Sequence, residues 1–461
     1  MSQAEAKTTP VAIAPRADFA AWWMLAVLFG LYVFSFVDRY ITTMLVPHIQ
    51  ASLDVSEFQM GLILGPAFAI FYSVFGIPLG WAADRYDRRW VIFIGACCFG
   101  LATVMSGLAT SFVMLLIARI AVGIGEASLS PAANSLLASR FPRHMLTTVL
   151  SIYTMGVKVG SAGAFILGGL LIAAAGVWVV TYDALADFEP WQIVFMATGL
   201  PAVLLALLVF TFKEPPRPAK KKAGVKPAAI IPFMRERKRL FIPMLIGFSL
   251  IALCTYSLTG WVPTYLHRHF GMEPVVYGPI LGLISTIAAF TLAFKGMFVD
   301  WLYRRGMKDA HIRFYTWLLI GSLPVVFALF WVQQPVIFMI MYGALQVVSI
   351  PIMAYVSAAM QLIAPTELRG RITGVFLFCL NGVGGGLGPV IVGSLTEYVF
   401  RDEMKVGWSL AVLICTAIPL ALVLLRLALK PLRAAIVEAE EREAAELAML
   451  QAAEAGQPGA S

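Results

Sequence analysis

Apolar stretches long enough to cross a membrane recur about twelve times along the 461-residue chain. A spanning helix needs about 20 apolar residues to cross a hydrocarbon core of about 30 Å. Such stretches lie near residues 20–45, 57–81, 90–108, 112–138, 145–176, 191–212, 240–266, 275–299, 312–332, 335–363, 370–399 and 407–429. The pattern predicts an all-α polytopic membrane protein, with twelve transmembrane helices in two pseudo-symmetric halves of six helices each.

The longest polar interruption divides these stretches into two groups. Residues 213–239 are rich in Pro and Lys, which is typical of a solvated linker rather than of a folded domain. The predicted organisation is an N-terminal tail (1–19), a first six-helix domain (20–212), a basic linker (213–239), a second six-helix domain (240–430) and a partly helical C-terminal tail (431–461).

Composition supports the membrane assignment. The chain is 60% hydrophobic and only 13% charged, whereas soluble domains carry about 25% charged residues. Its net charge of +8 is concentrated on one side of the predicted spans, as the positive-inside rule requires of cytoplasmic loops. We therefore expect a multi-pass protein of the cytoplasmic membrane with both termini in the cytoplasm, and anionic lipid rather than nucleic acid as the partner of the basic residues.

No residue pattern predicts a metal or an organic cofactor. The five cysteines lie inside predicted spans, and the five histidines lie near helix ends without metal-ligand spacing. The sequence also shows no nucleophile elbow or acyltransferase-like His/Asp motif, so an enzyme is not expected. The expected source of energy is a proton gradient.

A short motif is repeated at the same position in each half. Gly, Asp and an Arg pair recur at identical spacing after the second and the eighth span; the two copies are Gly80, Asp84, Arg88 and Arg89, and Gly296, Asp300, Arg304 and Arg305. The recurrence predicts that the second half arose as a copy of the first.

The first copy resembles the G-x-x-x-D-R-x-x-R-R loop signature of the major facilitator superfamily. The resemblance spans all twelve helices and implies two six-helix domains that rock about a central cavity. We expect Gly80 to permit close helix approach, Asp84 to accept from a neighbouring helix end or an Arg, and the Arg pair to anchor to lipid and bridge to the other half. The expected conformational switch comprises Gly80, Asp84, Arg85, Arg88, Arg89, Asp300, Arg304 and Arg305. The alternative is that these charges only set the topology.

Ionisable residues at membrane depth are concentrated in the first half. Each costs about 2.5–3.5 kcal/mol on insertion scales and therefore needs a reason. The first half contains Asp38, Arg39, Arg119, Glu126 and Lys158. The second half contains little beyond Lys295, which we expect to extend to the cytoplasmic surface.

The first four of these residues suggest a proton-sensitive ion network. Arg119 and Glu126 are seven residues apart on one helix and share a face, and the antiparallel first helix places Asp38 at the depth of Arg119. We expect the Arg119 guanidinium to reach both carboxylates. Protonation of Asp38 or Glu126 would then release Arg119 and change the stable helix packing. The alternative is a static salt network that holds two helices together.

Lys158 lies midway along the fifth span, on a strip of small residues formed by Gly156, Gly160, Gly163 and Gly168. Small residues let helices approach closely, which suits a gating helix. A midplane ammonium group suits an anionic head group, or a pair with Glu126. The expected substrate-binding residues are Lys158, Arg39, Arg119 and Glu126.

Two further segments narrow the resemblance. Phe36–Tyr40 with Val46–Ile49, and Arg119–Ala127, together look like the spinster family, the branch that moves sphingosine-1-phosphate and lysophospholipids. The resemblance implies that Asp38 and Glu126 are the protonation-sensitive acids and Arg119 their partner, with Arg39 in the same network.

These expectations amount to a monomeric, proton-coupled transporter of lysolipids or sphingosine-1-phosphate-like amphiphiles that works by alternating access. A carrier of small organic anions would use the same charges. A multidrug exporter is a further alternative, although Gly156–Ser161 departs from the G-x-x-x-G-P motif that is usual in such antiporters. The sequence leaves the substrate and the direction of transport open.

Overall fold

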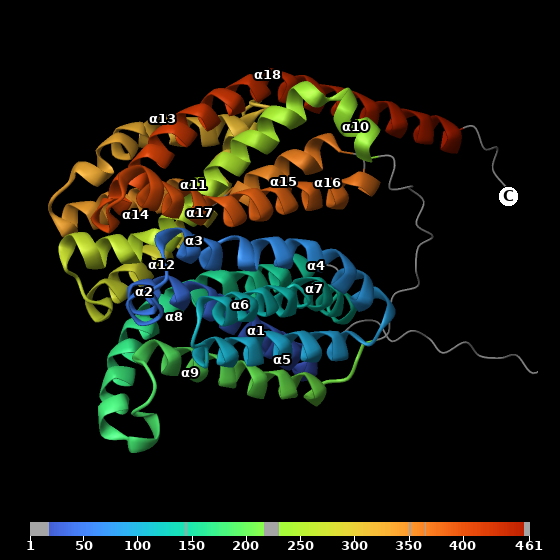
Figure 1. Ribbon diagram of the computed structural model, residues 1–461. Helices are drawn as coiled ribbons and strands as arrows, with labels where there is room; N and C mark the ends of the chain where they lie inside the picture. Colours follow the sequence, from blue (N-terminus) through green and yellow to red (C-terminus); the bar gives the residue numbers. More distant parts are fainter. Residues whose placement is uncertain (1–17, 143–144, 216–229, 350–351, 365, 456–461) are drawn as a thin grey trace, which may run out of the picture.

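The computed structural model describes residues 18–142, 145–215, 230–349, 352–364 and 366–455 (Figure 1). All regular structure in these ranges is helical. The first half comprises α1 (Phe19–Met44), α2 (Val46–Leu53), α3 (Glu57–Leu64), α4 (Pro66–Arg85), α5 (Arg88–Gly107), α6 (Phe112–Glu126), α7 (Leu129–Arg140), α8 (Leu146–Thr181) and α9 (Pro190–Leu207).

The second half follows a short helix, α10 (Ile230–Glu236), that lies within the predicted linker. It comprises α11 (Lys238–Phe270), α12 (Pro274–Arg304), α13 (Ala310–Ala328), α14 (Pro335–Ser349), α15 (Ile352–Ile363), α16 (Thr366–Cys379), α17 (Gly386–Ser394) and α18 (Val406–Ala455). Residues 1–17 of the predicted N-terminal tail, residues 216–229 of the linker and the last six residues lie outside the described ranges.

Eleven helices in the described ranges are long and apolar enough to cross a membrane. The tenth expected span is represented by α14 and α15, on either side of residues 350–351. The prediction of an all-helical, twelve-span fold is confirmed. The C-terminal tail continues the last span directly, because α18 runs without a break from Val406 to Ala455.

Several spans contain breaks that follow from their sequences. The second span changes direction between α3 and α4 at Gly65–Pro66, where proline cannot donate a backbone hydrogen bond. The eleventh span widens into a π-helical turn at Leu380–Gly385, between α16 and α17. Such turns often mark functional positions in helices.

The two halves are closely packed at one end of the molecule, which we call the far side. The opposite end, where α1 begins and residues 213–215 leave the first half, is called the linker side (right in Figure 1). One buried apolar cluster belongs to the first half alone, whereas the other joins far-side residues of the first half, such as Ile41 and Met60, to the second half.

Glycines make this packing possible. A Cβ built on Gly61 would lie 2.9 Å from Pro389 O, and one on Gly65 would lie 2.7 Å from Gly386 O, so α3 and α17 approach backbone to backbone. A Cβ on Gly169 would likewise collide with Pro274 O, at the contact of α8 with α12. Close approach of this kind is the usual role of small residues between membrane helices.

An ion pair reinforces the far-side contact. The Arg268 guanidinium of α11 lies 2.7 Å from Oε1 of Glu57 in α3, and both side chains are largely buried. Gln50 bridges the pair, since its amide donates to Glu57 (3.0 Å) and its carbonyl oxygen accepts from Arg268 (2.9 Å). The far side is therefore held by polar as well as apolar contacts between the halves.

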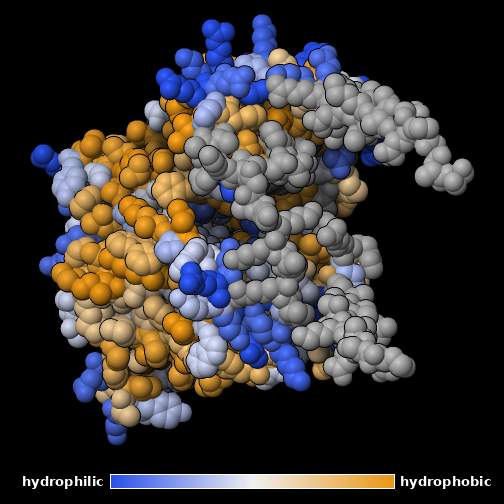
Figure 2. Space-filling model, turned by 90° about the vertical axis from the view of Figure 1, so that its right-hand side faces the viewer, coloured by the Kyte–Doolittle hydropathy of each residue, from blue (hydrophilic) through white to orange (hydrophobic). Residues whose placement is uncertain are grey.

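Figure 2 looks onto the linker side. Hydrophobic side chains cover much of this face, and hydrophilic side chains interrupt them near its centre and along its rim. A transporter that exposes its site on one side at a time needs one closed and one accessible end.

Replacement of Gly169 by valine should disrupt the far-side closure, because the added side chain collides with the backbone of α12. Spin labels at Val180 and Val336, both exposed on the far side, should move apart when measured by double electron–electron resonance. Gly176→Val is the matched control, since a Cβ there meets nothing within 4 Å. An unchanged distance in Gly169→Val would show that α8 and α12 do not control the closure.

Candidate substrate and proton site

The most deeply buried ion pair links α1 to α6. Arg119 Nη1 lies 2.9 Å from Oδ2 and 3.2 Å from Oδ1 of Asp38, and both side chains are only 3% exposed. The Thr103 hydroxyl of α5 also donates to Asp38 Oδ1 at 2.9 Å. A guanidinium and a hydroxyl thus compensate one carboxylate, which is what a charge in a dry interior requires.

A second ion pair lies beside it. Arg39 Nη2 donates to Glu126 Oε2 at 2.6 Å, and Glu126 is 1% exposed whereas Arg39 is 19% exposed. The Arg39 guanidinium carbon also lies 4.0 Å from the ring centroid of Phe68 and 4.6 Å from that of Phe36. Cation–π contacts of this kind stabilise a cation that has lost part of its water.

The expectation that Arg119 reaches both carboxylates is wrong for this conformation. Arg119 binds Asp38, and Arg39 binds Glu126. The reason is helical geometry: adjacent residues point about 100° apart around an α-helix, and Arg119 and Glu126 are separated by about 10 Å along α6. Asp38 and Arg39 therefore meet opposite charges at two different heights.

Three polar atoms in this network have no hydrogen-bond partner in the described ranges: Arg39 Nε, Arg119 Nε and Glu126 Oε1. Buried polar atoms without partners are rare and call for a structural or functional explanation. Glu126 Oε1 is the atom at which a proton can be added without displacing a hydrogen-bond donor.

Lys158 does not join either pair. It is partly exposed on α8, and the described residues include no carboxylate paired with it. The predicted glycine strip is only partly a gating surface: a Cβ on Gly156 or Gly160 would press on α1, whereas one on Gly163 would meet nothing within 4 Å. The glycine strip mainly allows α8 to pack closely against α1 within the first half.

Lys295 differs from the expectation that it extends to the surface. It is only 8% exposed, and its ammonium group donates to the backbone oxygen of Val347, in the last turn of α14. The second half therefore carries a buried cation of its own at membrane depth.

The loop signature forms a dense set of bonds within the first half. Arg88, which is 1% exposed, donates to Glu214 Oε1 (2.6 Å), to the backbone oxygen of Pro215 (2.8 Å) and to the hydroxyls of Ser135 (3.0 Å) and Ser139 (2.8 Å). These bonds tie α5 to α7 and to the start of the linker. The predicted bridge from Arg88 to the other half is not what this conformation shows.

The other arginine of the pair stays local as well. Arg89 binds Asp87 (2.8 Å) and the backbone oxygen of Phe212 (3.1 Å). The hydrogen bond from Arg89 holds the pKa of Asp87 well below its usual range, whereas burial raises the pKa of Glu214. Both arginines therefore organise one end of the first half.

Gly80, Asp84 and Arg85 are the other predicted switch residues of the first copy. A Cβ on Gly80 would lie 3.7 Å from Pro131, an ordinary contact, so close helix approach does not require glycine there in this conformation. Asp84 and Arg85 are exposed at the end of α4, and Asp84 takes part in an interaction.

In the second copy of the motif, Arg304 donates weakly to the backbone oxygen of Asp300 (3.4 Å). The Arg305 guanidinium lies 3.9 Å from the ring centroid of Trp301. Both contacts are made within α12 and its C-cap residue. The two copies of the motif therefore share a sequence pattern but not a pattern of contacts.

Sequence reasoning missed three residues with buried polar contacts, one in the site and two in the far-side contact between the halves. Thr103 gives no signal, because a single hydroxyl in a span is common and its partner lies on another helix. Glu57 follows Ser56 at the start of a helix, where an acidic residue is expected for the helix dipole alone. Arg268 lies in the last turn of a helix, where a basic residue is expected for the helix dipole alone.

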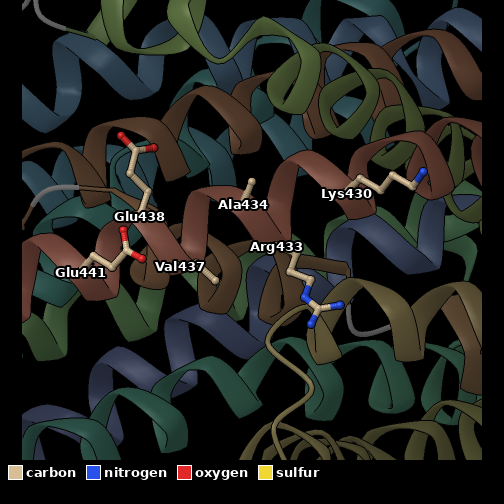
Figure 3. A pocket seen from close by; sticks show the side chains of 6 residues that line it. All are labelled: Lys430, Arg433, Ala434, Val437, Glu438 and Glu441. Carbon is tan, nitrogen blue, oxygen red and sulfur yellow. The ribbon is translucent and has the colours of Figure 1, made fainter.

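Two surface recesses along α18 lie away from the ion pairs. Figure 3 shows one along α18, lined by Lys430, Arg433, Ala434, Val437, Glu438 and Glu441. It is a shallow groove on the C-terminal helix with charges of both signs, and none of its lining residues belongs to the network around Asp38 and Glu126.

Known proteins with similar sequences identify the family. A family model described as Major Facilitator Superfamily matches residues 28–389. The chain belongs to the major facilitator superfamily. Members of this family are transporters rather than enzymes.

Individual members of the superfamily resemble the chain at similar levels. A "MFS-type efflux pump" of Mycolicibacterium smegmatis is 27% identical, over 83% of this chain and 86% of its own length. A "D-galactonate transporter" of Escherichia coli is 28% identical, over 81% of this chain and 88% of its own. "Protein spinster homolog 1" of Xenopus laevis is also 28% identical, over 66% of this chain and 59% of its own.

Solved structures agree on the fold. The crystal structure of a bacterial homologue of the human lysosomal transporter Spinster, in an inward-facing and unoccupied conformation, matches with a TM-score of 0.76 and 24% identity. The match covers 91% of this chain and 98% of that one. The spinster resemblance is thus confirmed, and the chain is equally similar to a transporter named for a different substrate.

Asp38→Asn should destabilise the protein by about 3–5 kcal/mol, because it leaves the Arg119 guanidinium buried without a counter-charge. Thermal unfolding of the purified protein in detergent measures this effect. The double variant Asp38→Asn/Arg119→Gln should recover most of the lost stability. A double variant less stable than the single one would show that the two residues are not mainly partners of each other.

Proposed function

We propose that this superfamily member is a proton-coupled secondary transporter of anionic amphiphiles or small organic anions. It works by alternating access, with a proton gradient as its only source of energy. The observation that supports this most directly is the presence of two ion pairs, Asp38–Arg119 and Arg39–Glu126, at membrane depth in one half. Ionisable groups there are costly and mark substrate or proton pathways.

Proton coupling would act through Glu126. Its Oε1 is buried and has no partner in the described ranges, while its Oε2 holds Arg39. Protonation removes the charge that attracts Arg39 and leaves that guanidinium, which is partly exposed, to find another anion. A substrate carboxylate or phosphate can take that place, and this links the proton to the substrate.

The second pair provides the structural half of the switch. Asp38–Arg119 lies deeper and is bonded to Thr103 as well, so its rupture would affect contacts among α1, α5 and α6. A change of protonation at Asp38 would therefore be transmitted to helix packing. The predicted roles of Asp38, Glu126, Arg119 and Arg39 as the coupling residues rest on this arrangement.

Two substrate classes follow from different observations. The spinster-like segments and the spinster relatives favour a lysolipid or a sphingosine-1-phosphate-like amphiphile. The galactonate relative, together with a "Hexuronate transporter" of Bacillus subtilis that is 27% identical, favours a small sugar acid. Both classes bear a carboxylate or phosphate that suits Arg39 and Lys158, whereas a cationic drug does not.

The proposed location is the cytoplasmic membrane, with both termini and the linker side in the cytoplasm. The basic residues of the linker-side loops support this orientation through the positive-inside rule. The protein is proposed to act as a monomer surrounded by anionic lipid, without nucleic acid, metal or organic cofactor.

Uptake into proteoliposomes tests the proposal. Labelled lysophospholipid and labelled D-galactonate are each offered with and without an imposed pH gradient. We expect the gradient to drive uptake of one of them, and Asp38→Asn or Glu126→Gln to reduce the driven uptake by at least about tenfold, which corresponds to about 1.4 kcal/mol.

Asp187→Asn is the control for a lost carboxylate, because Asp187 is exposed in a far-side loop. It should transport as the wild type does. Uptake that ignores the pH gradient, or that survives both interior substitutions, would contradict proton coupling. Uptake of galactonate but not of lysolipid would keep the coupling and assign the small-anion class.

A further inference from the structure

A recess opens between α13 and α18 on the outer surface of the second half. The two helices lie side by side (Figure 1), and the Cys415 thiol of α18 donates to the backbone oxygen of Val326 in α13 at 3.5 Å. Nearer the linker side, the same two helices border a recess with a volume of about 320 Å³. Its lining residues are Arg313, Thr316, Trp317, Arg426, Leu429 and Lys430.

The recess carries positive charge without negative charge. Three of its six lining residues are basic, and none is acidic. Asp309 lies 2.6 Å from the Arg313 guanidinium and compensates that one charge. Within the described ranges, no carboxylate forms a salt bridge with Arg426 or Lys430, and both side chains are exposed. They are four residues apart on α18 and therefore present two adjacent cations on one face.

The neighbouring groove on α18 differs in its charge. Its lining includes Glu438 and Glu441 as well as Lys430 and Arg433, so positive and negative side chains are equal in number there (Figure 3). A bound anion would meet two carboxylates in that groove and none in the recess between α13 and α18. The recess is therefore the better anion site of the two.

The recess lies where both of its helices change from apolar to charged. Residues 406–425 of α18 contain no charged side chain, and Arg426 is the first. Residues 314–328 of α13 likewise contain none, and Arg313 is the last charged residue of that helix. Trp317 is exposed at the same level, and tryptophan is enriched at the boundary between membrane and water. The recess is therefore placed at the level of phospholipid head groups.

The lining suits the head group of an anionic phospholipid. Guanidinium and ammonium groups bind phosphate oxygens through charge-assisted hydrogen bonds, and basic pockets between membrane helices on the cytoplasmic side bind anionic head groups. Trp317 and Leu429 add apolar surface that a lipid covers and a free phosphate ion does not. A zwitterionic lipid would bring its own ammonium group towards the cations, so a head group with net negative charge is favoured.

We propose that Arg313, Arg426 and Lys430 form a binding site for one anionic phospholipid of the surrounding leaflet and hold its phosphate at the linker-side boundary of the membrane. The site is separate from the ion pairs around Asp38 and Glu126, so its lipid is a bound partner and not the transported substrate. The lipid joins α13 to α18 at the point where α18 leaves the membrane, and its binding stabilises the second half.

Native mass spectrometry of the delipidated, full-length protein in a neutral detergent tests the site. Phosphatidylglycerol is compared with phosphatidylcholine of the same acyl chains, and with glycerol 3-phosphate, which has no acyl chains. The first phosphatidylglycerol should bind at least about tenfold more tightly than either of the others. Equal affinity for the two lipids would overturn the proposal. Glycerol 3-phosphate bound as tightly as phosphatidylglycerol would assign a soluble phosphate instead of a lipid, and would also overturn it.

The double variant Arg426→Gln/Lys430→Gln should weaken the first phosphatidylglycerol by about tenfold or more and leave phosphatidylcholine unchanged. The matched control is Lys238→Gln/Arg239→Gln, which removes the same two charges from exposed positions at the linker-side start of α11, outside the lining of the recess. It should bind as the wild type does. An equal loss in both double variants would indicate diffuse attraction to surface charge and would contradict a built site.

Thermal unfolding separates a binding role from a structural one. Without lipid, Arg426→Gln/Lys430→Gln should unfold at the temperature of the wild type, because both side chains are exposed. Phosphatidylglycerol should raise the unfolding temperature of the wild type and of the charge-keeping variant Arg426→Lys/Lys430→Arg, but not that of the glutamine variant. A lower unfolding temperature of the glutamine variant without lipid, or a wild type that does not respond to phosphatidylglycerol, would overturn the proposal.

Discussion

The structure depends on the compensation of charge in a region without water. An isolated carboxylate or guanidinium at membrane depth is costly, yet the first half carries four such groups in its interior. They are tolerated because each lies against an opposite charge, with a hydroxyl or an aromatic ring in support. The helices α1, α5 and α6 are consequently positioned by electrostatics as much as by shape.

This arrangement makes the two halves unequal. The first half contains both ion pairs and the bonded cluster around Arg88, and it has an apolar core of its own. The second half contributes apolar surface, a widened π-helical turn in its eleventh span and the buried cation Lys295. The halves meet through glycines on the far side, where backbones touch and little side-chain volume intervenes. The buried ion pairs and the close contact between the halves are therefore located in different places.

Much of this could be read from the sequence, because it depends on periodicity and depth. Span positions follow from apolar length, and the common depth of Asp38 and Arg119 follows from antiparallel helices. That Glu126 pairs with Arg39 rather than with Arg119 could not be predicted, because the pairing depends on how each helix is rotated about its axis. Rotation is set by packing over the whole interface and leaves no short-range signal.

The hydrogen-bond partners of the other basic residues could not be predicted from the sequence either. Lys295 resembles any lysine near a helix end until the position of α14 is known, since only that helix supplies the acceptor. The repeated motif predicts a duplication at the level of sequence. Its bonds differ between copies because Arg88 meets Ser135, Ser139 and Glu214, whereas the second copy faces its own helix. A repeat in sequence fixes where residues lie along a helix, not what surrounds them.

The last helix extends well past the membrane. α18 contains 50 residues and is therefore about 75 Å long, more than twice the thickness of a hydrocarbon core. Glu438 binds Arg237 before α11, and Glu440 binds Tyr303 and Lys308 around the end of α12. These bonds brace the rod against the second half, so it turns with that half as one body. A small rotation of the second half within the bilayer then becomes a displacement of many ångströms at the end of α18. The helix thereby carries a motion that begins inside the membrane to a point outside it.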